Sequence, residues 1–133
     1  MKDFDAIALE EIKKYTQGAD PEAYVYCVKY ANFFLFIMFG LLAQKPHVLA
    51  TRGEQFLFLR SNFGGNKFKG EYSVLQKSDI QNVGYKKFFL ANYITITKND
   101  GTKVRFVVST LYKRFKNQAD SLEKIKAKLG ITG

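Results

Sequence analysis

The sequence predicts a mainly β fold, an antiparallel barrel or sandwich of six to seven strands with a C-terminal capping helix and an extra N-terminal helix. Three observations predict it. β-Branched and aromatic residues form short segments between turn signals over residues 24–109. Helical periodicity is confined to the two ends of the chain. The 133 residues are 47% hydrophobic, which is enough for one domain with its own core.

Residues 1–20 form the first predicted segment, an amphipathic helix over residues 3–16. Its apolar positions recur at helical spacing, at Phe4, Ile7, Ala8, Ile12 and Tyr15. Asp3 or Asp5 is placed to cap the start of this helix, and Gly18 to end it. Residues 22–133 then form the main body of what we expect to be a single domain.

The central part of the chain divides into short segments that suit an antiparallel sheet. The predicted strands are Tyr24–Val28, Val48–Thr51, Gln55–Arg60, Lys67–Leu75, Ile80–Val83, Phe88–Thr97 and Val104–Val108. Turns are expected at Arg52–Glu54, Lys77–Asp79 and Lys98–Thr102, the last because Asp-Gly suits tight hairpins. In the third segment Phe56 and Phe58 share one face, while Leu57 and Leu59 share the other. Both faces of that strand are therefore apolar.

The last predicted element is a helix over residues 110–129. Leu111, Phe115, Ala119, Leu122, Ile125 and Leu129 step by three or four residues. Ser109 or Thr110 is placed to cap the start, and Gly130 to end it. We expect this helix to close one open end of the curved sheet, because an apolar stripe needs a surface to cover.

Residues 31–43 form the most apolar run of the chain. Thirteen residues are too few to span a bilayer as a helix, which needs about 20. Extending the run back to Ala23 reaches that length but includes Lys29. The run is predicted to be a buried strand, a buried helix or a membrane-contact segment. Its candidate apolar contact residues are Phe33, Phe34, Phe36 and Phe39.

The charge of the chain is unevenly distributed. The first 23 residues carry six acidic residues and three lysines, while the whole chain has a net charge of +9. A basic body attracts polyanions such as nucleic acids and anionic lipid headgroups. The candidate anion-binding patch consists of Arg60, Lys67, Lys69, Lys86 and Lys87. The alternative is that these lysines protect exposed strand edges and bind nothing.

Catalytic chemistry is not indicated. His47 is the one histidine, and the sequence pattern gives it no nucleophile or acid partner. Cys27 lies among apolar residues, which favours a buried, inert thiol. With so few histidines and cysteines, we expect no metal site, no cofactor and no small-molecule substrate. The sequence therefore predicts that the protein is not an enzyme.

Several short motifs lie in the order in which the strands and the last helix are expected. They are Leu49-Ala50-Thr51 followed by Phe56-Leu57-Phe58, Asp79-Ile80 before a strand, Ile94-Thr95-Ile96 before the Asn99–Gly101 turn, and the helix Ala119–Leu129. Together they resemble the bacterial pleckstrin-homology-like (PH-like) domains. With a first strand near residues 22–30, the resemblance covers most of residues 22–130. It implies a PH-like barrel or sandwich that acts as a non-enzymatic binding or scaffold module.

The chain also departs from that family. Glu54 stands where the hairpin often carries a basic residue, and the chain has no Trp, although a Trp in the final helix marks the eukaryotic pleckstrin-homology domains. The basic series that contacts phosphoinositides in eukaryotic relatives is not evident between the first two strands. The resemblance therefore assigns no lipid-binding residue.

Three kinds of partner follow from these observations. Another protein or a second copy of the chain suits the apolar run, and an anionic membrane surface suits the basic body. Single-stranded nucleic acid is the alternative, since lysines here are interleaved with aromatic residues. The first 20 residues lack the apolar core of a signal peptide, so we expect a cytoplasmic protein, peripheral at the inner face of the membrane if it binds lipid.

Overall fold

The computed structural model describes residues 3–30 and 44–131. Its elements are α1 (Phe4–Lys13), β1 (Ala23–Tyr30), β2 (Gln44–Arg52), β3 (Gln55–Ser61), β4 (Phe68–Gln76), the 3₁₀ turn η2 (Lys77–Asp79), β5 (Ile80–Phe88), β6 (Ala91–Lys98), β7 (Lys103–Ser109) and α3 (Gln118–Leu129). The mainly β fold with a helix at each end is thus confirmed. The candidate contact residues Phe33, Phe34, Phe36 and Phe39 lie outside the described residues.

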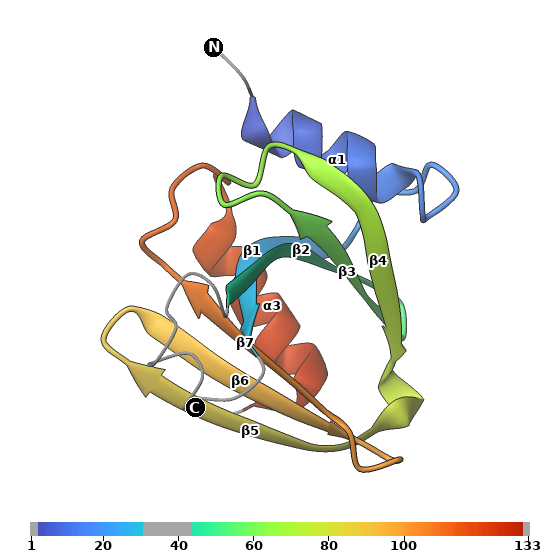
Figure 1. The fold of residues 1–133 in the computed structure, drawn as a ribbon, viewed down its shortest axis with the longest axis vertical. Coiled ribbons are helices and arrows are strands. Elements are labelled where there is room, and N and C mark those ends of the chain that lie inside the picture. The colour runs from blue at the N-terminus through green and yellow to red at the C-terminus, as the bar shows by residue number, and fades with distance from the viewer. Residues whose placement is uncertain (1–2, 31–43, 132–133) are drawn as a thin grey trace.

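The seven described strands form one antiparallel sheet in the order β4-β3-β2-β1-β7-β6-β5. The sheet bends into two halves, β1–β4 and β5–β7, which cross each other in Figure 1. Two register pairs join the halves, Val28 with Val107 and Lys29 with Phe106. The edge strands β4 and β5 leave the η2 corner in different directions, so the far ends of these strands lie apart (Figure 1).

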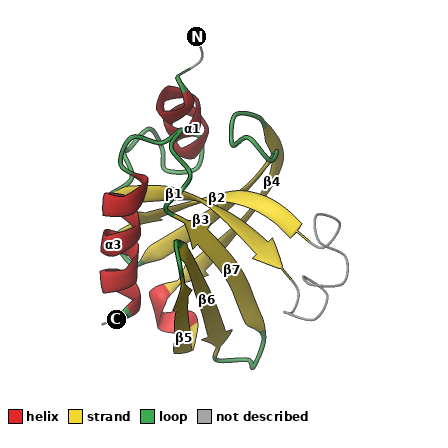
Figure 2. Ribbon diagram, turned by 90° about the vertical axis from the view of Figure 1, so that its left-hand side faces the viewer, coloured by secondary structure: helices red, strands yellow, loops and turns green. Residues whose placement is uncertain are grey.

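The main core lies between the two halves of the sheet and α3. Phe58 of β3 and Phe106 of β7 meet there, with ring centroids 5.5 Å apart. Leu122 and Ile125 of α3 are almost fully buried against them. Figure 2 shows α3 lying along one side of the sheet. Gly130 ends α3 at φ 78°, a left-handed conformation that suits glycine, as the sequence predicted.

A second core lies on the outer face of β2 and β3, under α1. Leu57 and Leu59 point into it from β3, and Ala8 and Ile12 of α1 cover them. The prediction that both faces of this strand are apolar is therefore confirmed. Asp3 caps α1, since its side chain accepts a hydrogen bond from the Ala6 N–H at 3.2 Å.

The strand predicted over Phe88–Thr97 is wrong at its start. The chain reverses at Phe89-Leu90, and Phe88 is the last residue of β5, paired with Ala91 of β6. Neither turn residue carries a turn signal, because both are large and apolar. The predicted turns at Arg52–Glu54 and Lys98–Thr102 are confirmed, each with a glycine at positive φ.

The C-terminal helix begins eight residues later than predicted, at Gln118. Residues 110–117 instead form an irregular segment between β7 and α3. Tyr112 stacks on Tyr26 of β1 with ring centroids 4.4 Å apart, and Phe115 enters the second core. The four-residue spacing of Leu111 and Phe115 imitates a helical stripe, although the two side chains do not share a surface.

Candidate anion-binding site

The inner face of the β1–β4 half changes from apolar to cationic toward one end. Leu49 and Phe58 are register partners in the main core. Because side chains alternate along a strand, the next positions on the same face are His47 and Arg60, which also pair with each other. Beyond them Lys45 lies opposite Lys29 of β1. We name Lys29, Lys45, His47 and Arg60 the cationic mouth.

The Phe58 ring of the main core contacts two residues of the cationic mouth, Lys29 and His47. The Lys29 ammonium lies 4.1 Å from the centroid of the Phe58 ring, and its Nζ is 3.5 Å from Ser73 Oγ. The His47 ring meets the edge of Phe58 at a centroid distance of 6.3 Å. His47 Nδ1 lies 2.8 Å from the Lys45 carbonyl. Since a carbonyl only accepts, Nδ1 carries a proton and donates it.

Burial and mutual repulsion shape the charges in the mouth. Burial lowers the pKa of Lys29, and the charges of Lys98 and Lys45 act in the same direction. Burial also lowers the pKa of His47 from its ordinary 6.5 to about 4. The hydrogen bond to the Lys45 carbonyl raises the pKa of His47, whereas the positive charges of Lys29, Arg60 and Lys45 lower it further. At neutral pH the mouth therefore holds a neutral imidazole among three crowded cations.

Arg60 provides an unmet hydrogen-bond donor. Its Nε is buried and has no hydrogen-bond partner within the part of the chain that the structure describes. Its Nη1 is 4.0 Å from Oε2 of Glu71, a carboxylate whose side chain is 74% exposed. A buried donor without an acceptor is unfavourable, and an ordered water or an ion can satisfy such a group. An anion at the mouth would satisfy it.

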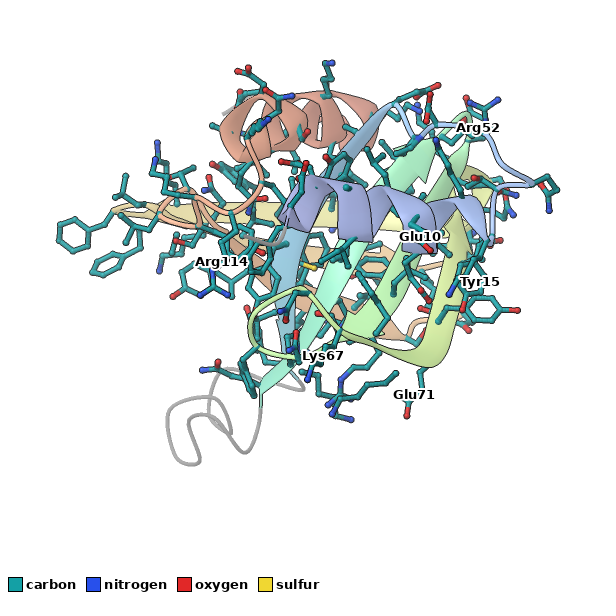
Figure 3. The ribbon with its side chains drawn as sticks, turned by 90° about the horizontal axis from the view of Figure 1, so that it is seen from above. Glu10, Tyr15, Arg52, Lys67, Glu71 and Arg114 are labelled. Carbon is teal, nitrogen blue, oxygen red and sulfur yellow. The ribbon has the colours of Figure 1, made fainter. Side chains whose placement is uncertain are left out.

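The five residues of the predicted basic patch fall into two separate groups. Arg60, Lys67 and Lys69 lie together, because Ser61 pairs with Phe68 at the end of the β3–β4 hairpin. Figure 3 shows Lys67 and Glu71 on the side of the molecule opposite α3.

Lys86 and Lys87 lie at the far end of β5, on the other edge strand of the sheet. The two strands diverge from η2, so the second group does not join the first (Figure 1). The fold therefore separates a basic group next to the mouth from a basic group at the end of the β5–β6 hairpin.

Sequence reasoning missed Lys29 and Lys45, which complete the mouth. A signal for them exists in the two-residue alternation, since Lys45, His47 and Leu49 share one face of β2. That alternation does not reveal which residue of β1 lies opposite Lys45. The strand register supplies Lys29, and a single sequence gives no register for strands joined by a long connection.

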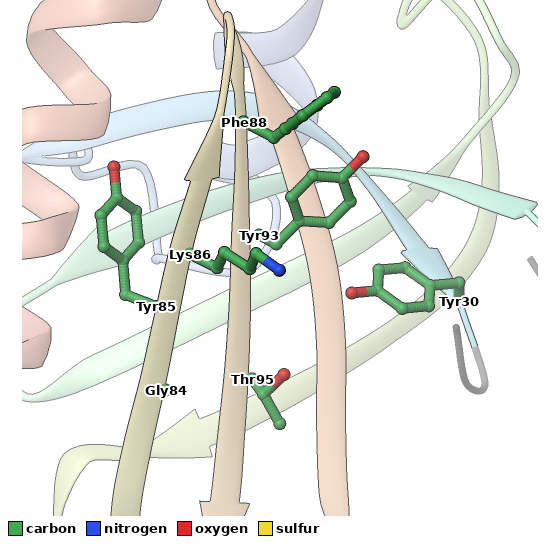
Figure 4. A pocket seen from close by; sticks show the side chains of 7 residues that line it. All are labelled: Tyr30, Gly84, Tyr85, Lys86, Phe88, Tyr93 and Thr95. Atoms are coloured by element: carbon green, nitrogen blue, oxygen red, sulfur yellow. The ribbon is translucent and has the colours of Figure 1, made fainter. Parts of the chain in front are cut away.

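A hollow lies on the outer face of the β5–β6 hairpin (Figure 4). It has a volume of about 610 Å³. Lys86 and Phe88 of β5 face Tyr93 and Thr95 of β6, and Tyr30 closes one side. The described residues that line it are Tyr30, Gly84, Tyr85, Lys86, Phe88, Tyr93 and Thr95. We name this hollow the aromatic groove.

The remaining features of the described chain concern metal ligands, the free thiol and the length of the helices. No group of three or more His, Cys, Asp or Glu side chains suited to a metal ion occurs in residues 3–30 and 44–131. Burial raises the pKa of the Cys27 thiol to about 12, so this cysteine stays protonated at neutral pH. Within the same residues, no helix has the length and apolar character needed to cross a membrane.

No protein-family model matches the chain, and no curated protein matches it either. We therefore argue its function from the geometry of its own residues.

Proposed function

We propose that the chain is a non-enzymatic PH-like binding module that takes a phosphate-bearing anion at the cationic mouth, at the cytoplasmic face of a membrane. The observation that carries the proposal is the strand register that sets Lys29 opposite Lys45 and Arg60 opposite His47, together with a buried Arg60 Nε that has no hydrogen-bond partner among residues 3–30 and 44–131. The seven-stranded sheet with its C-terminal helix supports the PH-like part of the proposal.

Phosphate is the anion that best suits these donors. A guanidinium presents a planar fork of N–H groups that matches two phosphate oxygens, and ammonium groups add point charges. A doubly charged group also offsets the repulsion among three cations better than a single carboxylate does. Glu71 is the one carboxylate that touches Arg60 in the described residues, and it lies at the exposed rim.

The proposal is tested by calorimetric titration with inorganic tripolyphosphate. The wild-type chain should bind it, and the variant Lys29→Gln/Arg60→Gln should bind at least roughly tenfold more weakly. The matched control is Lys77→Gln/Lys124→Gln, which removes two exposed positive charges outside the mouth. The control should stay within about twofold of wild type at moderate salt, because exposed charges at a distance are screened.

Equal losses in the mouth variant and the control would show that only net charge matters, and the mouth would not be a site. A wild-type chain that ignores tripolyphosphate would also refute the proposal. Competition from phosphatidic acid vesicles would identify a lipid headgroup as the source of the phosphate, whereas competition from free phosphate compounds alone would identify a ligand in solution. A short single-stranded DNA that binds far more tightly than either would favour nucleic acid instead.

A further inference from the structure

The end of the β5–β6 hairpin is the most exposed apolar feature of the described chain. Phe88 is 59% exposed, Phe89 81% and Leu90 46%. Leu111, which is 65% exposed, lies nearby because the Thr110 N–H donates to the Leu90 carbonyl at 3.0 Å. Four of the seven exposed large apolar side chains of residues 3–30 and 44–131 thus gather here. We name Phe88, Phe89, Leu90 and Leu111 the hairpin tip.

The turn at the tip is built from residues that a turn ordinarily avoids. Phe89 has φ 54°, in the left-handed region that favours glycine or asparagine. The β2–β3 and β6–β7 turns place Gly53 and Gly101 at their positive-φ positions. Exposing Phe89 and Leu90 is also unfavourable in water. The backbone strain and the exposed apolar surface thus occur in the same turn. Strained residues of this kind cluster at binding and catalytic sites.

The tip projects from the body of the domain. In Figure 1 the β5–β6 hairpin ends away from α1 and the β2–β3 hairpin, and in Figure 3 this half of the sheet extends to one side. The Phe88 and Phe89 rings meet edge to face at 4.5 Å between centroids, which keeps them together as one apolar wedge. A projecting wedge can reach a surface that the body of the domain does not touch.

Basic residues flank the tip in the sequence. Lys86 and Lys87 precede it on β5, and Lys113 and Lys116 follow Leu111, all four of them exposed. Neither residues 84–91 nor residues 109–116 contain an Asp or Glu. The Asp5 carboxylate of α1 accepts hydrogen bonds from the Tyr24 hydroxyl and from the Lys116 N–H, so Lys116 lies beside α1.

We infer that the hairpin tip inserts into the interface of an anionic lipid bilayer. An apolar wedge with a rim of lysines matches a surface that is apolar below and negatively charged above. The lysine stems can lie along the acyl boundary while their ammonium groups stay at the headgroups. The aromatic groove begins behind the wedge, so Tyr93 would lie at headgroup depth, where tyrosine is favoured. This contact is separate from the cationic mouth and goes beyond the proposed function.

The test compares sedimentation of two full-length variants with vesicles of phosphatidylcholine containing phosphatidylglycerol. Phe88→Thr/Phe89→Asn removes both rings and keeps the local backbone, since threonine suits a strand and asparagine tolerates positive φ. The matched control, Tyr72→Thr/Val74→Thr, removes two exposed apolar side chains from edge strand β4. We expect the tip variant to lose at least roughly tenfold in vesicle binding and the control to stay near wild type. Binding by the wild type should fall when phosphatidylglycerol is left out.

Insertion is also read directly by a fluorophore at the tip. The chain has no tryptophan, so Phe89→Trp places a single one there. With the same vesicles, its emission should shift to shorter wavelength and be quenched by brominated acyl chains. A tryptophan that stays in water while the protein binds vesicles would overturn the inference.

Other outcomes of the vesicle experiment would refute insertion or assign the hairpin tip to another partner. Vesicle binding that is unchanged in the tip variant refutes insertion, as does a wild type that binds no vesicles. A wild type that dimerises through the tip, and whose tip variant is monomeric, would assign the surface to a second copy of the chain instead. Tripolyphosphate binding should survive in the tip variant, whereas Lys29→Gln/Arg60→Gln should lose it. Failure of the mouth and failure of the tip are thereby distinguished.

Discussion

Strands β3 and β6 lie in the same sheet but differ in what covers their outer faces. In β3 both faces are buried, with Phe58 in the main core and Leu59 under α1. In β6 the inner residues Ile94 and Ile96 are buried, while Thr95 faces the aromatic groove. The N-terminal helix thus covers one half of the sheet, and among the described residues no helix covers the outer face of the other half.

The two halves of the sheet differ in where their buried and exposed side chains lie. The β1–β4 half is covered on both sides, and its polar groups lie where the apolar inner face ends, at the cationic mouth. Counting only residues 3–30 and 44–131, the β5–β7 half is covered on one side, and its exposed apolar residues gather at its free end. Both candidate surfaces therefore lie where the packing of the two cores stops.

The largest expected effect is on the stability of the doubly covered half. Leu59→Ala should lower the free energy of unfolding by about 2–5 kcal/mol, because Leu59 is 1% exposed and its loss leaves a cavity under α1. Thr95→Ala, on the outer face of β6, should cost less than about 1 kcal/mol. Urea unfolding of the two variants measures the difference. Similar losses would mean that the two outer faces are covered alike.

Much of this architecture could be predicted from the sequence. Alternation of Phe56, Leu57, Phe58 and Leu59 showed that one strand is apolar on both faces, and α1 supplied the cover. The hairpin turn at Phe89-Leu90 could not be predicted, because local turn chemistry favours glycine and asparagine there.

The two candidate surfaces also differ in how far they could be predicted from the sequence. Lys86 and Lys87 were visible as a basic pair beside apolar residues, whereas Lys29 joins the mouth only through its register with Lys45. Contacts between residues that are close in the chain can be predicted from local sequence patterns. Contacts set by strand pairing over residues far apart do not, and the fold has to supply them.

A smaller effect should appear in the pH dependence of stability. The pKa of His47 is about 4 in the folded chain, below the ordinary 6.5 expected after unfolding. Between these values the unfolded chain binds a proton that the folded chain does not, so stability falls as the pH decreases from 6.5 to 4. With partial solvent screening, we expect a loss on the order of 2 kcal/mol.

His47→Gln provides the comparison for this prediction. Glutamine can still donate to the Lys45 carbonyl but does not titrate. Urea unfolding at several pH values should show a shallower decline for the variant over this window. Carboxylates that titrate nearby affect both proteins equally and cancel in the difference. Parallel curves would show that His47 is not kept neutral in the mouth.

The smallest effect has the opposite sign and lies at the tip of the singly covered half. Phe89→Asn should raise the free energy of unfolding by roughly 0.5–1 kcal/mol, because asparagine adopts positive φ with less strain. Loss of the edge-to-face contact with Phe88 offsets only part of this gain, because both rings are exposed to solvent. Phe88→Thr, at the last position of β5, should give no such gain. A more stable Phe89→Asn protein with weaker vesicle binding would show that Phe89 serves the surface contact at the expense of the fold. A destabilised one would place its role in the fold itself.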